Sequence, residues 1–227
     1  MRTNELMCAC LVWFGSIPVW AAGPLEVDPV HHKLVFENEQ VRVIQTDWGP
    51  KESSAGSFDV ADSIIVRLTP AHFRIRLADG KTADRQGNLG AVTPGPAGRL
   101  SVENLLDQRV ASIVVELKGS GGRAAAGTPR IDPLTSDPAH HRLLFESEKV
   151  RVMRAVFGPG EAAAGFFDAW GAVIVTLTPT QFEVAMMDGK RMYPRFPSGA
   201  AGWFPEGRIL PKNQADMTAE FIVIEPK

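Results

Sequence analysis

Alternation of apolar and polar residues with a period of two is the clearest pattern along this chain. It is strict in residues 73–77 (FRIRL), where the apolar side chains fall on one face and the arginines on the other. Residues 63–68 and 110–117 are runs rich in β-branched side chains. Asp-Gly pairs at 79–80 and 188–189 are typical of hairpin turns. After the first 23 residues we find no convincing amphipathic helix, so the pattern predicts an all-β protein.

This strand pattern occurs twice in the chain. The segment DPVHHKLVFENEQVRV, which starts at Asp28, returns as DPAHHRLLFESEKVRV from Asp137, and the offset of 109 residues holds without a gap to the end. Of the 91 aligned positions, 38 are identical. Two copies are too few for a solenoid, whereas about 90 residues suffice for a compact β domain. The sequence therefore predicts a domain of residues 28–118, a linker of residues 119–136 and a second domain of residues 137–227.

The first 22 residues are predicted to be a signal peptide. A weakly positive start with Arg2 is followed by an apolar run over residues 6–19 and then by small residues. Cleavage is expected after Ala21, because Val19 then occupies the −3 position. An uncleaved membrane anchor is the alternative, although the run is at the short limit for a span. We expect a secreted or bacterial periplasmic protein with no membrane span in the mature chain.

Composition narrows the classes of function. The 227 residues include 24 Lys and Arg against 26 Asp and Glu, and a net charge of −2 argues against nucleic-acid binding. Both cysteines, Cys8 and Cys10, lie in the predicted leader, so the mature chain has no thiol for a disulfide, a nucleophile or a metal ligand. No nucleophile elbow, phosphate-binding glycine loop or HExxH motif occurs, and no histidine accompanies the scattered Ser and Asp residues as a hydrolytic triad requires.

The order of motifs in each copy resembles the cupin family. In the first copy FENEQVRV is followed by GPKE, a β-branched run, LADGK, PAG, VEN and a closing VVELK. The second copy repeats this order with FESEKVRV, GPGE, MMDGK, PEG and Asn213. The resemblance implies two tandem double-stranded β-helix (jelly-roll) barrels, a bicupin of the cupin-2 type. A tandem cupin contains within one chain the pairing that single cupins make as dimers, so we expect a monomer or a loose homodimer.

The resemblance also implies where a metal would bind, and the residues needed there are missing. Metal-binding cupins carry His-x-His and a later Glu in one motif and a His after Pro-x-Gly in another, since a divalent ion needs several converging ligands. In the first copy these positions fall on Ser57, Asp59, Asp62 or Ser63, and Leu100; in the second they fall on Phe166, Asp168, Gly171 or Ala172, and Ile209. We therefore expect both barrels to lack a metal and any other cofactor.

Some polar and aromatic side chains near these positions are candidate ligand-binding residues: Ser57, Asp59, Asp62, Arg99, Asp168, Trp170 and Arg208. Asp59 and its counterpart Asp168 could accept hydrogen bonds from a hydroxylated or amine ligand in a barrel pocket. They could also cap a turn or pair with a nearby arginine for structural reasons, which is the interpretation we favour.

The two copies differ in the size of the side chains near the same positions. Where the first copy has Ser57, Ala61, Pro94 and Gly95, the second has Phe166, Trp170, Trp203 and Phe204. These large groups either fill the second barrel, which we favour, or line an apolar or sugar-stacking pocket. The first copy is the better candidate for an open cavity.

Four of the five histidines form a pair at the start of each copy, at 31–32 and 140–141. They are interpreted as solvated side chains that tie the start of each copy to its barrel, rather than as a metal-capturing pair. The fifth, His72, lies opposite the apolar face of residues 73–77 and is expected at the surface.

Two functions remain. The favoured hypothesis is an exported, non-catalytic module that binds a small molecule or has a structural role. The alternative is a metal-dependent cupin enzyme of the dioxygenase or isomerase type, with atypical ligands such as Asp59 and Asp62 in the first domain.

Overall fold

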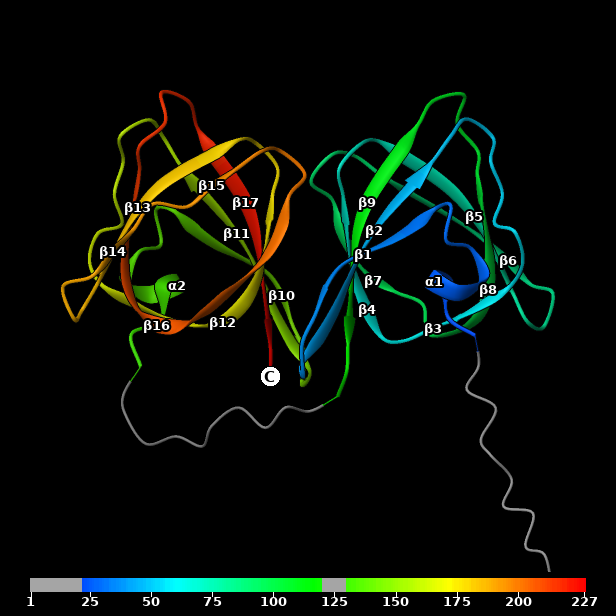
Figure 1. The fold of residues 1–227 in the computed structure, drawn as a ribbon, viewed down its shortest axis with the longest axis horizontal. Coiled ribbons are helices and arrows are strands. Elements are labelled where there is room, and N and C mark those ends of the chain that lie inside the picture. The colour runs from blue at the N-terminus through cyan, green and yellow to red at the C-terminus, as the bar shows by residue number, and fades with distance from the viewer. Residues whose placement is uncertain (1–21, 120–129) are drawn as a thin grey trace, which may run out of the picture.

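The computed structural model describes residues 22–119 and 130–227. Within these ranges the chain forms two β-barrels that lie side by side (Figure 1). The predicted signal peptide, apart from Ala22, and residues 120–129 of the predicted linker lie outside the described residues. Among the residues that are described, no helix is long and apolar enough to cross a membrane.

The first barrel consists of a five-stranded antiparallel sheet, in the order β1-β2-β9-β4-β7, and a four-stranded one, in the order β3-β8-β5-β6. Its elements are α1 (Pro24–Val27), β1 (His32–Glu37), β2 (Val41–Trp48), β3 (Phe58–Val60), β4 (Ser63–Arg67), β5 (Ala71–Leu77), β6 (Thr82–Gly87), β7 (Val92–Gly95), β8 (Gly98–Asn104) and β9 (Val110–Leu117).

The second barrel repeats this arrangement with two longer strands, in the order β10-β11-β17-β12-β16-β13-β14, with β15 beside β13. Its elements are α2 (Pro133–Ser136), β10 (His141–Glu146), β11 (Val150–Phe157), β12 (Phe167–Thr176), β13 (Thr180–Met186), β14 (Arg191–Met192), β15 (Arg195–Phe196), β16 (Ala201–Asn213) and β17 (Ala219–Pro226). β12 spans the positions of β3 and β4, and β16 those of β7 and β8, so these strands join what are separate sheets in the first barrel. Two tandem antiparallel barrels confirm the predicted all-β fold.

Alternation along each strand separates the barrel interior from its outer face. In β5, Phe73 and Ile75 are buried while the intervening Arg74 is partly exposed and Arg76 exposed, which confirms the predicted alternation. In β2, Thr46 and Trp48 line the interior, and Val43 lies on the opposite face. Because side chains alternate along a strand, each interior position is fixed once one of them is known.

The outer faces of the two barrels pack against each other and form one shared core. Its members are buried aliphatic side chains from both copies: Val41, Val43, Ile64, Val66, Ile113 and Val115 from the first, and Val150, Val152, Val173, Val175, Leu177, Ile222 and Ile224 from the second. At the margins, Arg154 Nη2 donates to the carbonyl of Gly90 at 3.0 Å, and Lys149 pairs with Asp62. The outer faces of the β-branched strands are therefore apolar because the other barrel covers them.

The structural repeat begins before residue 28. α1 and α2 occupy positions 109 residues apart, and the chain just before each helix pairs with its barrel. The Asp59 amide donates to the carbonyl of Ala22 at 3.1 Å, as the Asp168 amide does to that of Ile131 at 2.9 Å. Residues 131–136, which were predicted to be linker, thus pack onto the second barrel.

Candidate ligand-binding site

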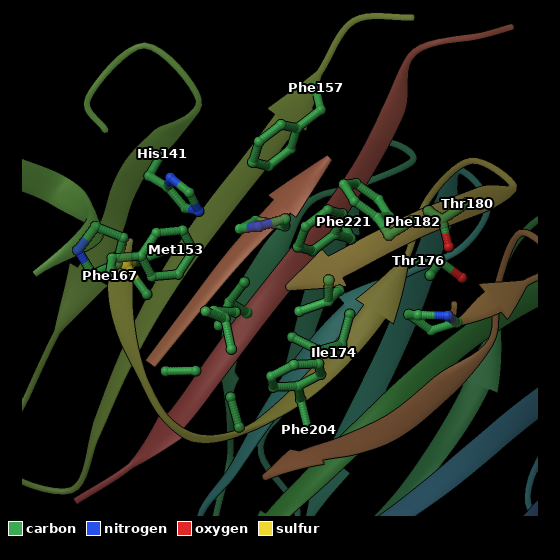
Figure 2. A pocket seen from close by; sticks show the side chains of 18 of the residues that line it. His141, Met153, Phe157, Phe167, Ile174, Thr176, Thr180, Phe182, Phe204 and Phe221 are labelled. Atoms are coloured by element: carbon green, nitrogen blue, oxygen red, sulfur yellow. The ribbon is translucent and has the colours of Figure 1, made fainter. Parts of the chain in front are cut away.

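Each barrel encloses a cavity between its sheets. The cavity of the first barrel has a volume of about 90 Å³ and that of the second about 100 Å³. Figure 2 shows the second cavity, with Phe157, Phe182 and Phe221 close together and Phe204 on another strand. Of the four large side chains of the second copy, only Phe204 lines this cavity, and Phe166, Trp170 and Trp203 lie outside its lining. They therefore do not fill the barrel, contrary to the favoured interpretation, and the alternative of an apolar pocket holds for Phe204 alone.

Both cavities have polar residues in their lining, and only that of the first includes a cation; the second has His141, Asp168, Thr176, Thr180 and Glu225. Besides apolar walls that include Trp48, Phe58 and Phe73, the first cavity is lined by five polar residues, His32, Thr46, Ser63, Arg67 and Glu116. At the positions that correspond to Thr46, Ser63 and Arg67, the second barrel has Ala155, Ala172 and Thr176. The two cavities are alike in size and differ in polarity.

Arg67 ends β4, and its guanidinium lies inside the first barrel. The residue is only 8% exposed. Its Nη1 donates to Ser112 Oγ at 3.0 Å, and its Cζ lies 5.0 Å from the centroid of the Phe73 ring, within cation–π range. Burial lowers the pKa of Arg67 to about 10, so the side chain stays protonated at neutral pH.

Glu116 lies at the opposite end of the cavity from Arg67. The antiparallel register pairs Ser63 with Glu116 and Arg67 with Ser112, so the two charged residues are separated by four positions along the strands. Burial raises the pKa of Glu116, although the positive charge of Arg42, 3.5 Å away, opposes this. The cavity therefore has a cationic end and a carboxyl end.

The second barrel pairs its buried arginine with two carboxylates. Arg151, the counterpart of Arg42, donates through Nε to Glu225 at 2.7 Å and through Nη1 to Asp132 at 2.5 Å. Burial acts to lower the pKa of Arg151, but these two carboxylates outweigh it and raise that pKa above the ordinary value. At the place of Arg67 is Thr176, whose Oγ1 donates to the carbonyl of Pro197 at 2.6 Å.

The paired histidines are not solvated, which corrects the expectation from sequence. His31 stacks on Trp48 with ring centroids 4.2 Å apart, and its ring nitrogens lie 2.8 Å from Asp28 Oδ1 and 3.0 Å from Glu52 Oε2. The second copy repeats this cluster with His140 stacked on Phe157. His32 and His141 are buried behind them, and burial lowers the pKa of both. As predicted, these residues tie the start of each copy to its barrel.

Comparison with solved structures supports a fold assignment. No protein-family model matches the chain, and no curated protein matches its sequence. AerE from Microcystis aeruginosa is similar in structure with a TM-score of 0.58 at 11% identity, covering 86% of this chain and 97% of that one. A cupin 2 conserved barrel domain protein from Leptotrichia buccalis has a TM-score of 0.51 at 11% identity, covering 86% and 88%. An oxalate decarboxylase from Bacillus subtilis has a TM-score of 0.56 at 12% identity, covering 85% and 71%.

The chain has a tandem cupin fold. At these identities the likeness concerns the fold alone, and the chemistry of this bicupin has to be argued from its own residues.

The residues that line the bicupin's cavities do not fit a divalent metal. The side chains that face inward near the expected ligand positions are Phe58, Val60, Ser63 and Leu100 in the first barrel, and Phe167, Ala169, Ala172 and Ile209 in the second. A guanidinium in the first cavity would repel a cation. Among residues 22–119 and 130–227, no three His, Cys, Asp or Glu side chains are grouped so that they could hold a metal ion.

The register of the first metal motif differs by one residue from the expected one. Phe58 and Val60 face the cavity, rather than Ser57 and Asp59 on either side of Phe58. A shift of one position moves every side chain of a strand to its other face. In the second barrel Phe167 and Ala169 take the inward places in the same way.

Of the seven predicted ligand-binding residues, only Asp168 lines a cavity. Its carboxylate is already held by Arg208 Nε at 2.7 Å, Arg208 Nη2 at 2.9 Å and the Ile131 amide at 2.8 Å. The bond from Arg208 lowers the pKa of Asp168. The carboxylate is thus occupied by a structural ion pair.

The other six predicted residues lie outside the cavity linings. Asp59 pairs with Arg99 at 3.2 Å, and Asp62 pairs with Lys149 across the domain boundary. Ser57 is exposed. Trp170 lies beneath the guanidinium of Arg151, 4.4 Å from ring centroid to Cζ. Pairing with arginine, the structural interpretation of the two aspartates, is the one that the structure shows.

The sequence did carry a signal for Arg67. The runs IIVRLTP and VIVTLTP align without a gap between the copies, and Arg67 is the only charged residue in either. Strand alternation from Ser63 would have placed it on the same face as Ser63 and Ile65. That face is the cavity face.

Proposed function

We propose that this bicupin is an exported protein that binds a small molecule in the cavity of its first barrel and does not catalyse a reaction. The observation that carries this proposal is the polar lining of that cavity. Arg67, Ser63 and Thr46 present a charge and two hydroxyls to the cavity. Buried polar groups cost free energy unless they find partners, so a cavity that keeps them suits a polar ligand.

The two copies support a binding role for one barrel and a different role for the other. Both barrels retain the same ion pair, Glu116 with Arg42 in the first and Glu225 with Arg151 in the second. Only the first adds Arg67, together with the hydroxyls of Thr46 and Ser63, whereas the second has the hydroxyls of Thr176 and Thr180 and no cation. The shared pair is explained by barrel structure, whereas the residues unique to the first cavity are those that a ligand would contact.

A cavity-filling variant tests the proposal. Ser63 pairs with Gly95 in register, and a Cβ added at Gly95 would lie 2.1 Å from Ser63 Oγ. The corresponding pair in the second barrel is Ala172 with Phe204, which lines that cavity. The double variant Ser63→Ala/Gly95→Phe therefore introduces a side-chain pair that the same fold already accommodates. Thr82→Phe is the control, because Thr82 is exposed and pairs in register with Arg76 on the outer face of the barrel.

The assay is ligand-observed NMR with a library of charged and neutral compounds of about ten non-hydrogen atoms or fewer. Compounds that bind the mature protein should lose binding in the double variant and keep it in Thr82→Phe. Equal binding by the double variant, or no binding by any compound, would overturn the proposal. Stoichiometric Fe, Mn, Ni or Zn in the purified protein, lost in Asp59→Ala, would favour a metal-dependent enzyme instead.

Export is part of the proposal and rests on the predicted signal peptide of residues 1–22. N-terminal sequencing of protein recovered from the periplasm or medium should begin at Ala22. Recovery of the full chain from the membrane fraction would instead indicate a retained anchor. We further propose a monomer or loose homodimer, because the outer faces of the two barrels already cover each other within one chain.

A further inference from the structure

Arg67 is a buried cation for which the protein supplies no carboxylate. Two arginines are buried within the described part of the chain, Arg67 and Arg151. Arg151 has two carboxylate partners, Glu225 and Asp132. Among the described residues, Arg67 makes no ion pair and one side-chain hydrogen bond, to the hydroxyl of Ser112. Buried charges are normally paired, so an unpaired one that lines a cavity needs another partner.

The guanidinium of Arg67 keeps most of its donors for such a partner. A guanidinium has five N–H donors in a planar fork, and here only Nη1 is engaged. Among the residues described, none accepts a hydrogen bond from Nε or Nη2. This pair of nitrogens is one of the edges through which arginine grips a carboxylate with two parallel hydrogen bonds.

The size of the cavity restricts the ligand. A volume of about 90 Å³ holds roughly six to nine waters at 10–15 Å³ each, which suits a compact organic molecule. Trp48, Phe58 and Phe73 provide an apolar wall around the remaining space. An ion that is polar on all sides, such as phosphate, would leave these walls unused and meet only one cation.

The carboxyl end of the cavity restricts the charge of the ligand. Arg67 and Glu116 are separated by four strand positions, roughly 13 Å along the chain at 3.3 Å per residue. A second negative group on a longer ligand would extend from Arg67 toward Glu116. Like charges in a poorly solvated cavity repel each other strongly.

We propose that the first barrel binds a compact organic monocarboxylate, with its carboxylate on the guanidinium of Arg67 and its apolar part against Trp48, Phe58 and Phe73. The inference rests on the proposed function and names the chemical class of the ligand. The second barrel, with Thr176 in place of Arg67, does not bind this class.

The test is an NMR titration of the mature protein with butanoate, butanamide, succinate and inorganic phosphate. Butanamide matches butanoate in shape without the charge, and succinate adds a second carboxylate. We expect butanoate to bind at least tenfold more tightly than the other three, with shifted resonances confined to the first barrel. Hydrogen bonds to a charged group correspond to about a ten- to hundredfold difference in affinity.

Two variants and one control connect that binding to Arg67. Arg67→Met should weaken butanoate binding by at least tenfold, and Arg67→Lys should restore it only in part, because lysine lacks the planar fork. Arg76→Met, at an exposed position on the outer face of β5, removes the same charge and should leave binding unchanged. Thermal unfolding of each variant checks that the barrel is folded.

Three results would overturn the inference. They are equal binding of butanoate and butanamide, tighter binding of phosphate or succinate, and unchanged butanoate binding in Arg67→Met. If butanoate and butanamide bind equally and the cavity-filling variant abolishes the binding of both, the preference for a monocarboxylate is refuted and the proposed function remains intact. Failure of every library compound to bind would refute both.

Discussion

Replacing Arg67 with methionine is expected to leave the ligand-free protein as stable as before, or slightly more stable. The guanidinium is 8% exposed and has no carboxylate partner among the described residues. Methionine keeps an unbranched side chain and removes the charge. A residue retained for a ligand at the expense of the fold should respond in this way, whereas a residue that stabilises the barrel should not.

The magnitude follows from the contacts of Arg67. Burial lowers its pKa to about 10, and at about 1.4 kcal/mol per pKa unit this change corresponds to about 3 kcal/mol against the charged form. The hydrogen bond to Ser112 and the contact with the Phe73 ring return about 2 kcal/mol together. The variant should therefore gain about 1 kcal/mol in free energy of unfolding.

The pH of the measurement follows from the sign of that pKa change. The folded-state pKa of Arg67, about 10, lies below the unfolded one, so the folded protein binds fewer protons than the unfolded chain only above about pH 10. The penalty is fully present below about pH 10 and is relieved only as the pH rises above that value. A measurement at pH 7 therefore includes all of it.

Arg151→Met is the matched comparison in the second barrel. Arg151 is equally buried, but its loss leaves the carboxylates of Glu225 and Asp132 without it. Removing one partner of a buried ion pair costs about 3–5 kcal/mol. Urea unfolding of the mature protein, with butanoate absent, should thus separate the two variants by about 4 kcal/mol or more. A loss of 2 kcal/mol or more in Arg67→Met would refute the reasoning, because Arg67 would then stabilise the fold.

Three further predictions concern the structure around the cavities. The buried side-chain amide of Asn213 bonds through Nδ2 to three carbonyl oxygens, and its Oδ1 accepts a hydrogen bond from one backbone N–H, so Asn213→Ala should lower the free energy of unfolding in urea by about 2–4 kcal/mol. The control Lys212→Ala, at an exposed position, should lower it by less than about 0.5 kcal/mol. Stability should fall as the pH drops from 7.5 to 5.5, because burial lowers the pKa of His32 and His141 and only the unfolded chain then takes up those protons. The urea midpoint of His141→Gln should fall less over this pH range. A fall as large as that of the unaltered protein would contradict this prediction. Asp59→Ala, which breaks a solvent-exposed pair with Arg99, should cost at most about 1 kcal/mol and leave butanoate binding as it was.

Much of the fold could be predicted from local sequence patterns. Strict alternation in residues 73–77 gave the inward face of β5, and the 109-residue offset gave the second barrel from the first. The offset also extends to α1 and α2, which lie before the residues where similarity is obvious. These features depend on neighbouring residues and on the comparison of one copy with the other, and a single sequence is sufficient for both.

The candidate site was predicted less well because it depends on strand register. Asp59 and Phe58 are adjacent in sequence, and only the pairing of β3 with β8 decides which of them faces the cavity. The burial of His31 likewise depends on Trp48, 17 positions away, and on Glu52 beyond it. Arg67 was missed because it ends a strand whose other residues are explained by packing alone.

The way the two barrels pack leaves the interior of each barrel free to change on its own. Val43 and Val66 of the first barrel share one core with Val152 and Val175 of the second, so a change on either outer face would disturb both copies at once. The interior of one barrel can change without this cost, because its cavity contacts nothing in the other. Each cavity can thus diverge independently, and the cavity that keeps a buried charge without a carboxylate partner is the one in which a ligand would relieve the cost of that charge.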